Sequence, residues 1–211
     1  MSDVVAAFDV DGTLTTKDTF APFLRAAGGS LRFAAAAAAV APRVMLVALR
    51  RATRDDVKRQ MVRRLLAGRT ADEIDRLGVA HASHIEQRWL RTDTVARLRW
   101  HQREGHRTVL VSASLRAYLR PLGAALGVDD VLCTDVALDG NLVTGELVGE
   151  NCRGPEKAVR LVAWAGGRKP AELWAYGDSA GDDEMLALAD RAVRGRRSRY
   201  LASVPVDDKA D

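Results

Sequence analysis

Residues 4–15, VVAAFDVDGTLT, decide the fold of this 211-residue chain. The run begins with apolar residues, which predicts a buried strand of a parallel sheet. It ends on Asp9 and Asp11, and side chains two positions apart on a strand point to the same face. Two carboxylates that close repel each other unless a cation lies between them or one of them holds a proton. The stretch therefore predicts a reactive site at the end of the first strand, in preference to an acidic turn.

The rest of the chain changes pattern once, near residue 93. No strand pattern appears between residues 16 and 92, which indicates a helical insert. Beyond it, helices alternate with apolar strands, at residues 108–111, 131–136, 173–176 and 192–193. Such alternation predicts a parallel sheet with right-handed crossovers and ligands at the carboxyl ends of the strands. We therefore expect an α/β core formed by residues 1–15 and 93–211, with a helical cap formed by residues 16–92.

The composition is that of a globular protein with a basic surface. The formal net charge is +4, which favours anionic partners such as phosphorylated metabolites, acidic lipid surfaces or nucleic acids. Aromatic residues make up only 5% of the chain and form no ladder among basic residues, so we expect no nucleic-acid binding. Two cysteines and the absence of a visible signal peptide predict free thiols and a cytoplasmic location. Nothing in the pattern predicts an oligomeric state.

Residues 33–49 form the most apolar part of the helical insert. A membrane span needs about 20 consecutive apolar residues, and Pro42 with Arg43 divides this run into two shorter pieces. We expect a buried pair of helices within the cap. The alternative is a helix that lies against a lipid surface, which would make the cap a peripheral membrane contact.

Two further segments, around Ser112 and Lys157, offer phosphate ligands, although each taken alone is more typical of a serine at a helix N-cap and of a solvated lysine. Ser112 follows the strand at residues 108–111, and its hydroxyl with the backbone N–H of Ala113 at a helix start suits a phosphate oxygen. Lys157 lies in the first turn of a predicted helix, where a cation opposes the helix dipole. Its ammonium group can act as a point charge on a phosphate.

The fourth segment, GDSAGDD at residues 177–183, is acidic. Asp178 ends a predicted strand, and Asp182 and Asp183 follow one turn later. These carboxylates are the hard oxygen ligands that Mg²⁺ takes in proteins. Their arrangement favours a metal site over an ordinary acidic helix start.

The four segments together resemble the haloacid-dehalogenase-like (HAD) phosphatases. The motif DVDGTLT at residues 9–15 is similar to the first motif of that superfamily, and the segments around Ser112, Lys157 and Asp178 follow in the order of the other three. The helical insert and a hairpin pattern at residues 138–147 resemble the phosphoserine-phosphatase-like branch, subfamily IB. The resemblance implies a Rossmann-like parallel sheet with an all-helical cap inserted after the first strand.

The resemblance also implies a mechanism, that of a Mg²⁺-dependent phosphomonoester hydrolase. Asp9 would be the nucleophile that forms an aspartyl-phosphate, and Asp11 would be the general acid and base. Mg²⁺ would be bound by Asp9, the main-chain carbonyl of Asp11 and Asp178, with Asp182 or Asp183 holding metal-bound waters. The transferring phosphate would be held by Gly12, Thr13, Ser112, Ala113 and Lys157.

The substrate is implied only as a class, a small phosphometabolite such as phosphoserine. Phosphoserine phosphatases carry Ser and Glu where this chain has Gly12 and Asp18. Residues 18–25, DTFAPFLR, are instead similar to the start of the cap in bacterial phosphatidylglycerophosphatases, so a phospholipid head group is the alternative substrate. We expect Asp18, Phe20 and Arg25 to take part in substrate selection. A catalytically vestigial, basic nucleic-acid-binding module is the alternative from a different class.

Overall fold

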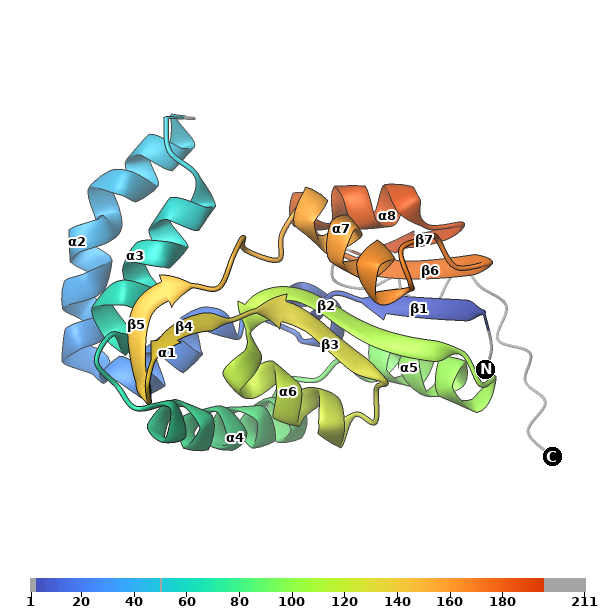
Figure 1. The fold of residues 1–211 in the computed structure, drawn as a ribbon, viewed down its shortest axis with the longest axis horizontal. Helices are drawn as coiled ribbons and strands as arrows, with labels where there is room; N and C mark the ends of the chain where they lie inside the picture. Colours follow the sequence, from blue (N-terminus) through green and yellow to red (C-terminus); the bar gives the residue numbers. More distant parts are fainter. Residues whose placement is uncertain (1–2, 50, 196–211) are drawn as a thin grey trace.

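A five-stranded parallel sheet forms the centre of the protein. The computed structural model describes residues 3–49 and 51–195. The strand order is β3-β2-β1-β6-β7, and every neighbouring pair is parallel. The strands are β1 (Val4–Phe8), β2 (Arg107–Leu115), β3 (Asp130–Thr134), β6 (Glu172–Gly177) and β7 (Arg191–Arg194). This arrangement confirms the predicted α/β fold class, with β1 in the middle of the sheet (Figure 1).

Helices cover both faces of the sheet and form two apolar cores. One face packs against α5 (Thr92–Arg103) and α6 (Arg116–Ala125), and the other against α7 (Pro155–Trp164) and α8 (Asp183–Leu188) (Figure 1). Phe8 of β1 stacks on Tyr176 of β6 in the first core, with ring centroids 4.4 Å apart. Ala7 belongs to the second core. Because side chains alternate along a strand, Asp9 emerges on the same face as Ala7, the face that α7 covers.

Within the described part of the chain, four α-helices lie between β1 and α5 in the sequence. They are α1 (Phe20–Gly28), α2 (Ser30–Ala48), α3 (Arg54–Leu66) and α4 (Ala71–Arg88). An antiparallel hairpin, β4 (Val136–Asp139) and β5 (Leu142–Leu147), packs against α3 and forms a bridge between Leu142 and Thr70. The division of the chain into a core and a cap at residues 16 and 92 stays a prediction.

The two backbone crossings between this helical part and the sheet are paired with each other. Thr15 forms an antiparallel bridge with Leu90. The N–H of Thr16 donates to the carbonyl of Trp89 at 2.8 Å, and the N–H of Arg91 donates to the carbonyl of Leu14 at 2.8 Å. The two crossings therefore form a short two-stranded ribbon.

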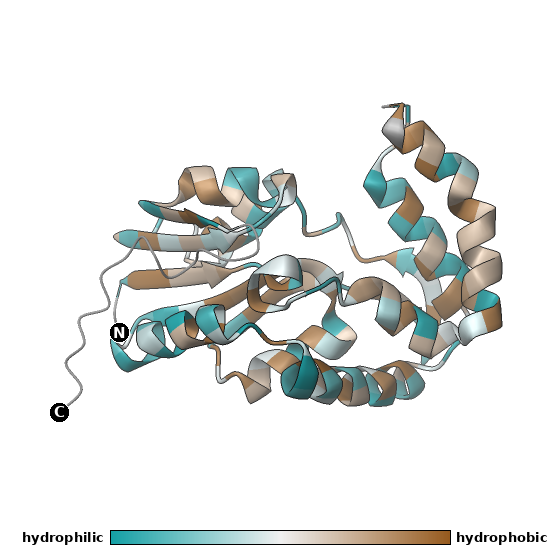
Figure 2. Cartoon of the chain, turned by 180° about the vertical axis from the view of Figure 1, so that it is seen from behind, coloured by the Kyte–Doolittle hydropathy of each residue, from teal (hydrophilic) through white to brown (hydrophobic). Residues whose placement is uncertain are grey.

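The expectation for the apolar residues 33–49 is wrong in two respects. First, α2 continues through Pro42 as one helix, because an exposed helix tolerates the missing N–H and the local bend that proline introduces. Second, α2 is not one of a buried pair, since only 11% of residues 30–47 are buried. By length and composition it is a helix that could cross a membrane, and Figure 2 shows hydrophobic colours along its length.

Candidate active site

The first motif forms a tight irregular turn directly after β1. Gly12 has a φ of 88°, in the left-handed region that glycine adopts without strain. A Cβ atom at this position would lie 2.3 Å from Oδ2 of Asp178. Glycine is therefore required twice here, for the turn itself and for the close approach of the turn to Asp178. The first and fourth motifs, 166 residues apart, meet at this point.

Three carboxylates converge where β1 and β6 end. Asp9, Asp178 and Asp182 each offer an oxygen atom, and these atoms lie within 4.8 Å of one another. Asp9 and Asp182 are buried, and Asp178 is half-buried. Hard, mostly buried oxygen donors that converge in this way fit a divalent cation such as Mg²⁺. The sequence-based grouping of Asp9, Asp178 and Asp182 thus matches the positions of these side chains.

Lys157 lies inside this acidic cluster. Its Nζ atom is 2.6 Å from Oδ1 of Asp9 and 2.6 Å from Oδ1 of Asp182, and only 2% of its side chain is exposed. The position in the first turn of α7, unfavourable for the helix dipole, is explained by these two ion pairs. Three carboxylates against one ammonium leave an excess of negative charge when all are ionised. A bound divalent cation would neutralise that excess.

The protonation of the cluster follows from burial and from these ion pairs. Burial raises the pKa of Asp9, an effect that the Lys157 ammonium opposes and the Asp182 charge reinforces. Burial also raises the pKa of Asp178, and the Asp182 charge adds to it. Burial disfavours the charged form of Asp182 too, but Lys157 and hydrogen bonds from Ser179 hold the pKa of Asp182 below its usual value. A divalent cation would favour the ionised forms that a nucleophile and metal ligands need.

Asp11 lies apart from the acidic cluster and is held by different residues. Its Oδ1 accepts hydrogen bonds from the backbone N–H of Thr19 at 2.7 Å and from the Thr19 hydroxyl at 2.6 Å. Its Oδ2 accepts from the hydroxyl of Ser114. Burial, followed by the charge of Asp18, raises the pKa of Asp11, although the hydrogen bonds oppose this shift. A fixed carboxyl group with a raised pKa suits a general acid.

Ser112 and Ala113 lie within β2, which continues to Leu115, so the expectation that Ala113 begins a helix is wrong; α6 begins at Arg116. Ser112 is buried, and its Oγ accepts a hydrogen bond from the backbone N–H of Ser114 at 3.1 Å. Thr13 is buried in the turn after β1. The carbonyl of Ala113 accepts a hydrogen bond from the ammonium of Lys58, which comes from α3.

Lys58 is a site residue that the sequence analysis missed. Its Nζ also donates to Oδ1 of Asn151 at 2.5 Å and lies 5.0 Å from the centre of the Phe20 ring. The amide of Asn151 in turn donates to Asp55 at 2.6 Å. Burial lowers the pKa of Lys58 to about 8. Nothing in the sequence distinguishes this lysine from the arginines around it, because its burial arises from contacts with segments more than 50 residues away.

The remaining predicted residues lie at the margin of the site. Asp18 is exposed, accepts a hydrogen bond from the N–H of Ala21 at 3.0 Å and is near enough to Asp11 to raise its pKa. Phe20 lies under Lys58, as described above. Arg25 lies in the last turn of α1, where its Nε donates to Ser30 at 3.2 Å. Asp183 is exposed and forms an ion pair with Arg194, outside the acidic cluster.

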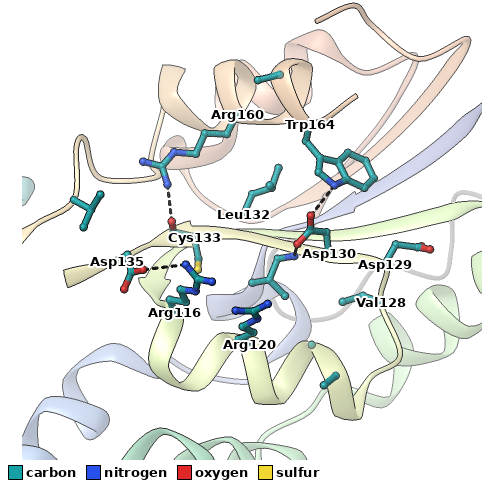
Figure 3. A pocket seen from close by; sticks show the side chains of 15 residues that line it. Arg116, Arg120, Val128, Asp129, Asp130, Leu132, Cys133, Asp135, Arg160 and Trp164 are labelled. Atoms are coloured by element: carbon teal, nitrogen blue, oxygen red, sulfur yellow. Dashed lines mark hydrogen bonds and ion pairs between the residues drawn. The ribbon is translucent and has the colours of Figure 1, made fainter. Parts of the chain in front are cut away.

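A sizeable hollow is found elsewhere, beside the edge strand β3. It has a volume of about 820 Å³ and is bounded by residues of α6, β3 and α7 (Figure 3). In Figure 3, Arg160 and Trp164 reach from α7 to this strand, and they donate to the Cys133 carbonyl and to Asp130. These side chains shield the strand edge, as natural sheets require. The hollow shares no residue with the acidic cluster, so its size does not indicate the reactive site.

Cys133 and Cys152 are both buried free thiols, as expected.

Comparisons with known proteins agree with this geometry. Residues 6–187 match the family model of the haloacid dehalogenase-like hydrolases. Protein CicA of Caulobacter vibrioides is 35% identical over 198 residues, which cover 92% of this chain and 88% of CicA.

Solved structures share the fold. A protein of unknown function from Bordetella pertussis Tohama I has a TM-score of 0.77 and 25% identity, over 92% of this chain and 90% of that one. A substrate-bound phosphoserine phosphatase complex has a TM-score of 0.59 and 19% identity, over 88% of this chain and 82% of that one. From the family match and the CicA relationship, we conclude that this chain belongs to the haloacid dehalogenase-like hydrolase family.

Proposed function

We propose that this hydrolase is a Mg²⁺-dependent phosphomonoesterase that works through an aspartyl-phosphate on Asp9. The observation that carries the proposal is the separation of two kinds of carboxylate. Asp9 lies with Asp178 and Asp182 around the Lys157 ammonium, whereas Asp11 is held apart by Thr19 and Ser114. The first group suits nucleophilic and metal-binding chemistry, and Asp11 suits proton transfer.

The proposed reaction has two steps. In the first, a carboxylate oxygen of Asp9 attacks phosphorus, the bond from phosphorus to the leaving oxygen breaks, and Asp11 donates its proton to that oxygen. In the second, Asp11 accepts a proton from the water that attacks phosphorus, which frees inorganic phosphate and restores Asp9. Lys157 and Ser112 hold the transferring phosphate oxygens. Mg²⁺, held by Asp9, the Asp11 carbonyl, Asp178 and Asp182, would reduce the repulsion between an anionic nucleophile and an anionic substrate.

Intact-mass spectrometry and phosphate release test this mechanism together. With Mg²⁺ and an aryl phosphate, wild type should release phosphate and accumulate a phosphorylated species after acid quenching. Asp9→Asn should show neither, with an unchanged circular dichroism spectrum, because the amide is a poor nucleophile of the same shape. An Asp9→Asn variant that retains turnover would rule out the covalent mechanism.

The proposed substrate is a small phosphometabolite such as phosphoserine. The buried ammonium of Lys58, next to Ala113, supports an anionic group on the substrate in addition to the phosphate. The exposed apolar surface of α2 favours a second candidate, a phosphorylated phospholipid head group. A phosphate-release screen over phosphoserine, sugar phosphates, nucleotides and phosphatidylglycerophosphate separates the two. A cytoplasmic location is part of the proposal.

The non-enzymatic alternative makes the opposite prediction. If the acidic cluster were vestigial, no phosphate would be released from any of these esters. Binding of DNA or RNA with a steep salt dependence, together with that inactivity, would favour a nucleic-acid-binding module.

A further inference from the structure

One face of α2 is apolar along the whole helix and is exposed. The members of this outer face recur every three or four residues, so they form one stripe on a helix about 28 Å long. They are Leu31, Ala34, Ala35, Ala38, Ala41, Pro42 and Met45, all exposed. Leu31 is 89% exposed, Met45 65%, and Leu49 just beyond the helix 60%. Large apolar side chains that are exposed together mark an interaction surface more often than a free one.

The opposite face of α2 already has its partners. Ala36 and Val40 are buried, Phe33 is half-buried against the same apolar core, and α2 packs on both α1 and α3. The helix therefore cannot leave its neighbours to cross a bilayer without exposing this packing and the charged helix α3. Its outer face remains available to a partner that approaches from one side.

The charge around the outer face indicates the chemistry of that partner. Residues 19–54 contain six arginines and no acidic residue, more positive charge than the net +4 of the whole chain. Arg32 and Arg43 are exposed and three turns apart, so they lie on one flank of the outer face. Within residues 3–49 and 51–195, no ion pair is formed by four of these arginines, which are Arg32, Arg43, Arg51 and Arg54.

We propose that the outer face of α2 docks on an anionic phospholipid surface, with the helix in the plane of the membrane interface. Leu31, Met45 and Leu49 would enter the acyl region, and the flanking arginines would meet the phosphate groups of the lipids. A second copy of the chain fits less well, because the arginine flanks of two copies would repel each other. The outer face shares no residue with the acidic cluster, so docking does not depend on the proposed hydrolytic function.

Vesicle binding of the full chain tests the proposal directly. Co-sedimentation would compare vesicles of phosphatidylglycerol mixed with phosphatidylcholine against pure phosphatidylcholine vesicles. We expect at least about 10-fold tighter binding to the anionic vesicles, weakened by added salt. The double variant Leu31→Glu with Met45→Glu should lose at least about 10-fold in binding, since it places two carboxylates in the interface.

The matched control is Val79→Glu with Val159→Glu. These valines are 59% and 60% exposed and lie on α4 and α7, away from α2, so the control adds the same charge without touching the outer face. It should bind vesicles more tightly than the α2 double variant. Circular dichroism verifies that both variants are folded. If Leu31→Glu with Met45→Glu fails to fold, Arg32→Gln with Arg43→Gln replaces it, and should weaken binding to anionic vesicles alone.

Three results would overturn the proposal. The first is an absence of binding to anionic vesicles by the wild type. The second is equal binding to neutral and anionic vesicles, or equal loss in the control and the α2 variant. The third is a wild-type dimer in light scattering that the α2 variant dissociates while neither protein binds vesicles, which would mean that a second copy covers the outer face.

Discussion

Replacement of Lys157 by methionine tests the electrostatics of the acidic cluster. The methionine keeps the length of the side chain but removes the ammonium that lies 2.6 Å from both Asp9 and Asp182. Removal of one partner from a buried ion pair costs about 3–5 kcal/mol, because the remaining charge stays buried without compensation. For a chain of this size, that loss corresponds to a fall in Tm of roughly 6–20 °C.

Thermal unfolding in the presence of a chelator measures this loss, and Lys169→Met provides the control. Lys169 also lies 2.6 Å from a carboxylate, that of Asp190, but both side chains are about 40% exposed. Exposed pairs contribute only about 0–1 kcal/mol, so the control should change Tm by no more than a few degrees. The distance between the charged atoms is the same, so the two lysines differ in burial and in the second carboxylate that Lys157 contacts.

The same reasoning predicts how the destabilisation of Lys157→Met changes with pH and with added Mg²⁺. Without the ammonium, the pKa values of Asp9 and Asp182 in the folded protein rise, so the destabilisation is complete only above those raised values and shrinks as pH falls through them toward the ordinary aspartate pKa of about 3.9. Added Mg²⁺ should restore part of the lost Tm, because a cation again lies among the carboxylates. Equal losses in Lys157→Met and Lys169→Met, or a Lys157→Met protein that Mg²⁺ does not stabilise, would refute this account.

Three other substitutions address individual positions. Gly12→Ala puts a Cβ 2.3 Å from Asp178 Oδ2 and forces alanine to a φ of 88°, so calorimetry should find weaker Mg²⁺ binding and a stability loss of about 1–2 kcal/mol. Binding of Mg²⁺ equal to wild type would contradict this. Lys58→Met should change stability little, because the lost hydrogen bonds to Ala113 and Asn151 are offset by removal of a buried charge whose pKa burial lowers. The KM for anionic substrates should rise; an unchanged KM would exclude Lys58 from substrate binding. The KM of the wild type should also rise as pH increases through about 8, because Lys58 loses its charge there. The stability of the wild type should increase between about pH 8 and 10.5, because in that range the unfolded chain binds more protons than the folded protein. Asp11→Asn should lower kcat for alkyl phosphates by roughly 10²–10⁴ and for nitrophenyl phosphate much less, because only the poor leaving group needs the proton; equal losses for both esters would argue against the acid role.

Much of the site could be predicted because parallel strands deliver their ends to one edge of a sheet. Asp9 and Asp178 follow two neighbouring strands, so local patterns of apolar and acidic residues were enough to bring them together. The ion pairs of Lys157 were less accessible to such patterns, because they depend on how the start of α7 meets two strand ends.

The sequence-based predictions are wrong or incomplete where tertiary contacts determine which residues are buried and which enter the site. A largely apolar helix such as α2, in which only Arg32 and Arg43 are charged, carries little periodic signal that tells its buried face from its exposed face, so the expectation of a buried pair could not be checked from the sequence. Lys58 and Asn151 become part of the site only because Lys58 of α3 contacts Ala113 within β2 and Asn151 in the segment after the hairpin. The strand expected at residues 131–136 stops at Thr134, and the chain leaves the sheet there to begin β4.

The ribbon formed by residues 14–16 and 89–91 has a mechanical consequence. Because Thr16 and Arg91 each donate a hydrogen bond across it, the two crossings are tied to each other and would have to move together. Any swing of the helices beyond this ribbon carries Thr19, whose two hydrogen bonds orient Asp11. Asp11 is thus oriented jointly by Thr19, from the helical insert, and by Ser114 of β2, whereas Asp9 follows directly on the central strand β1.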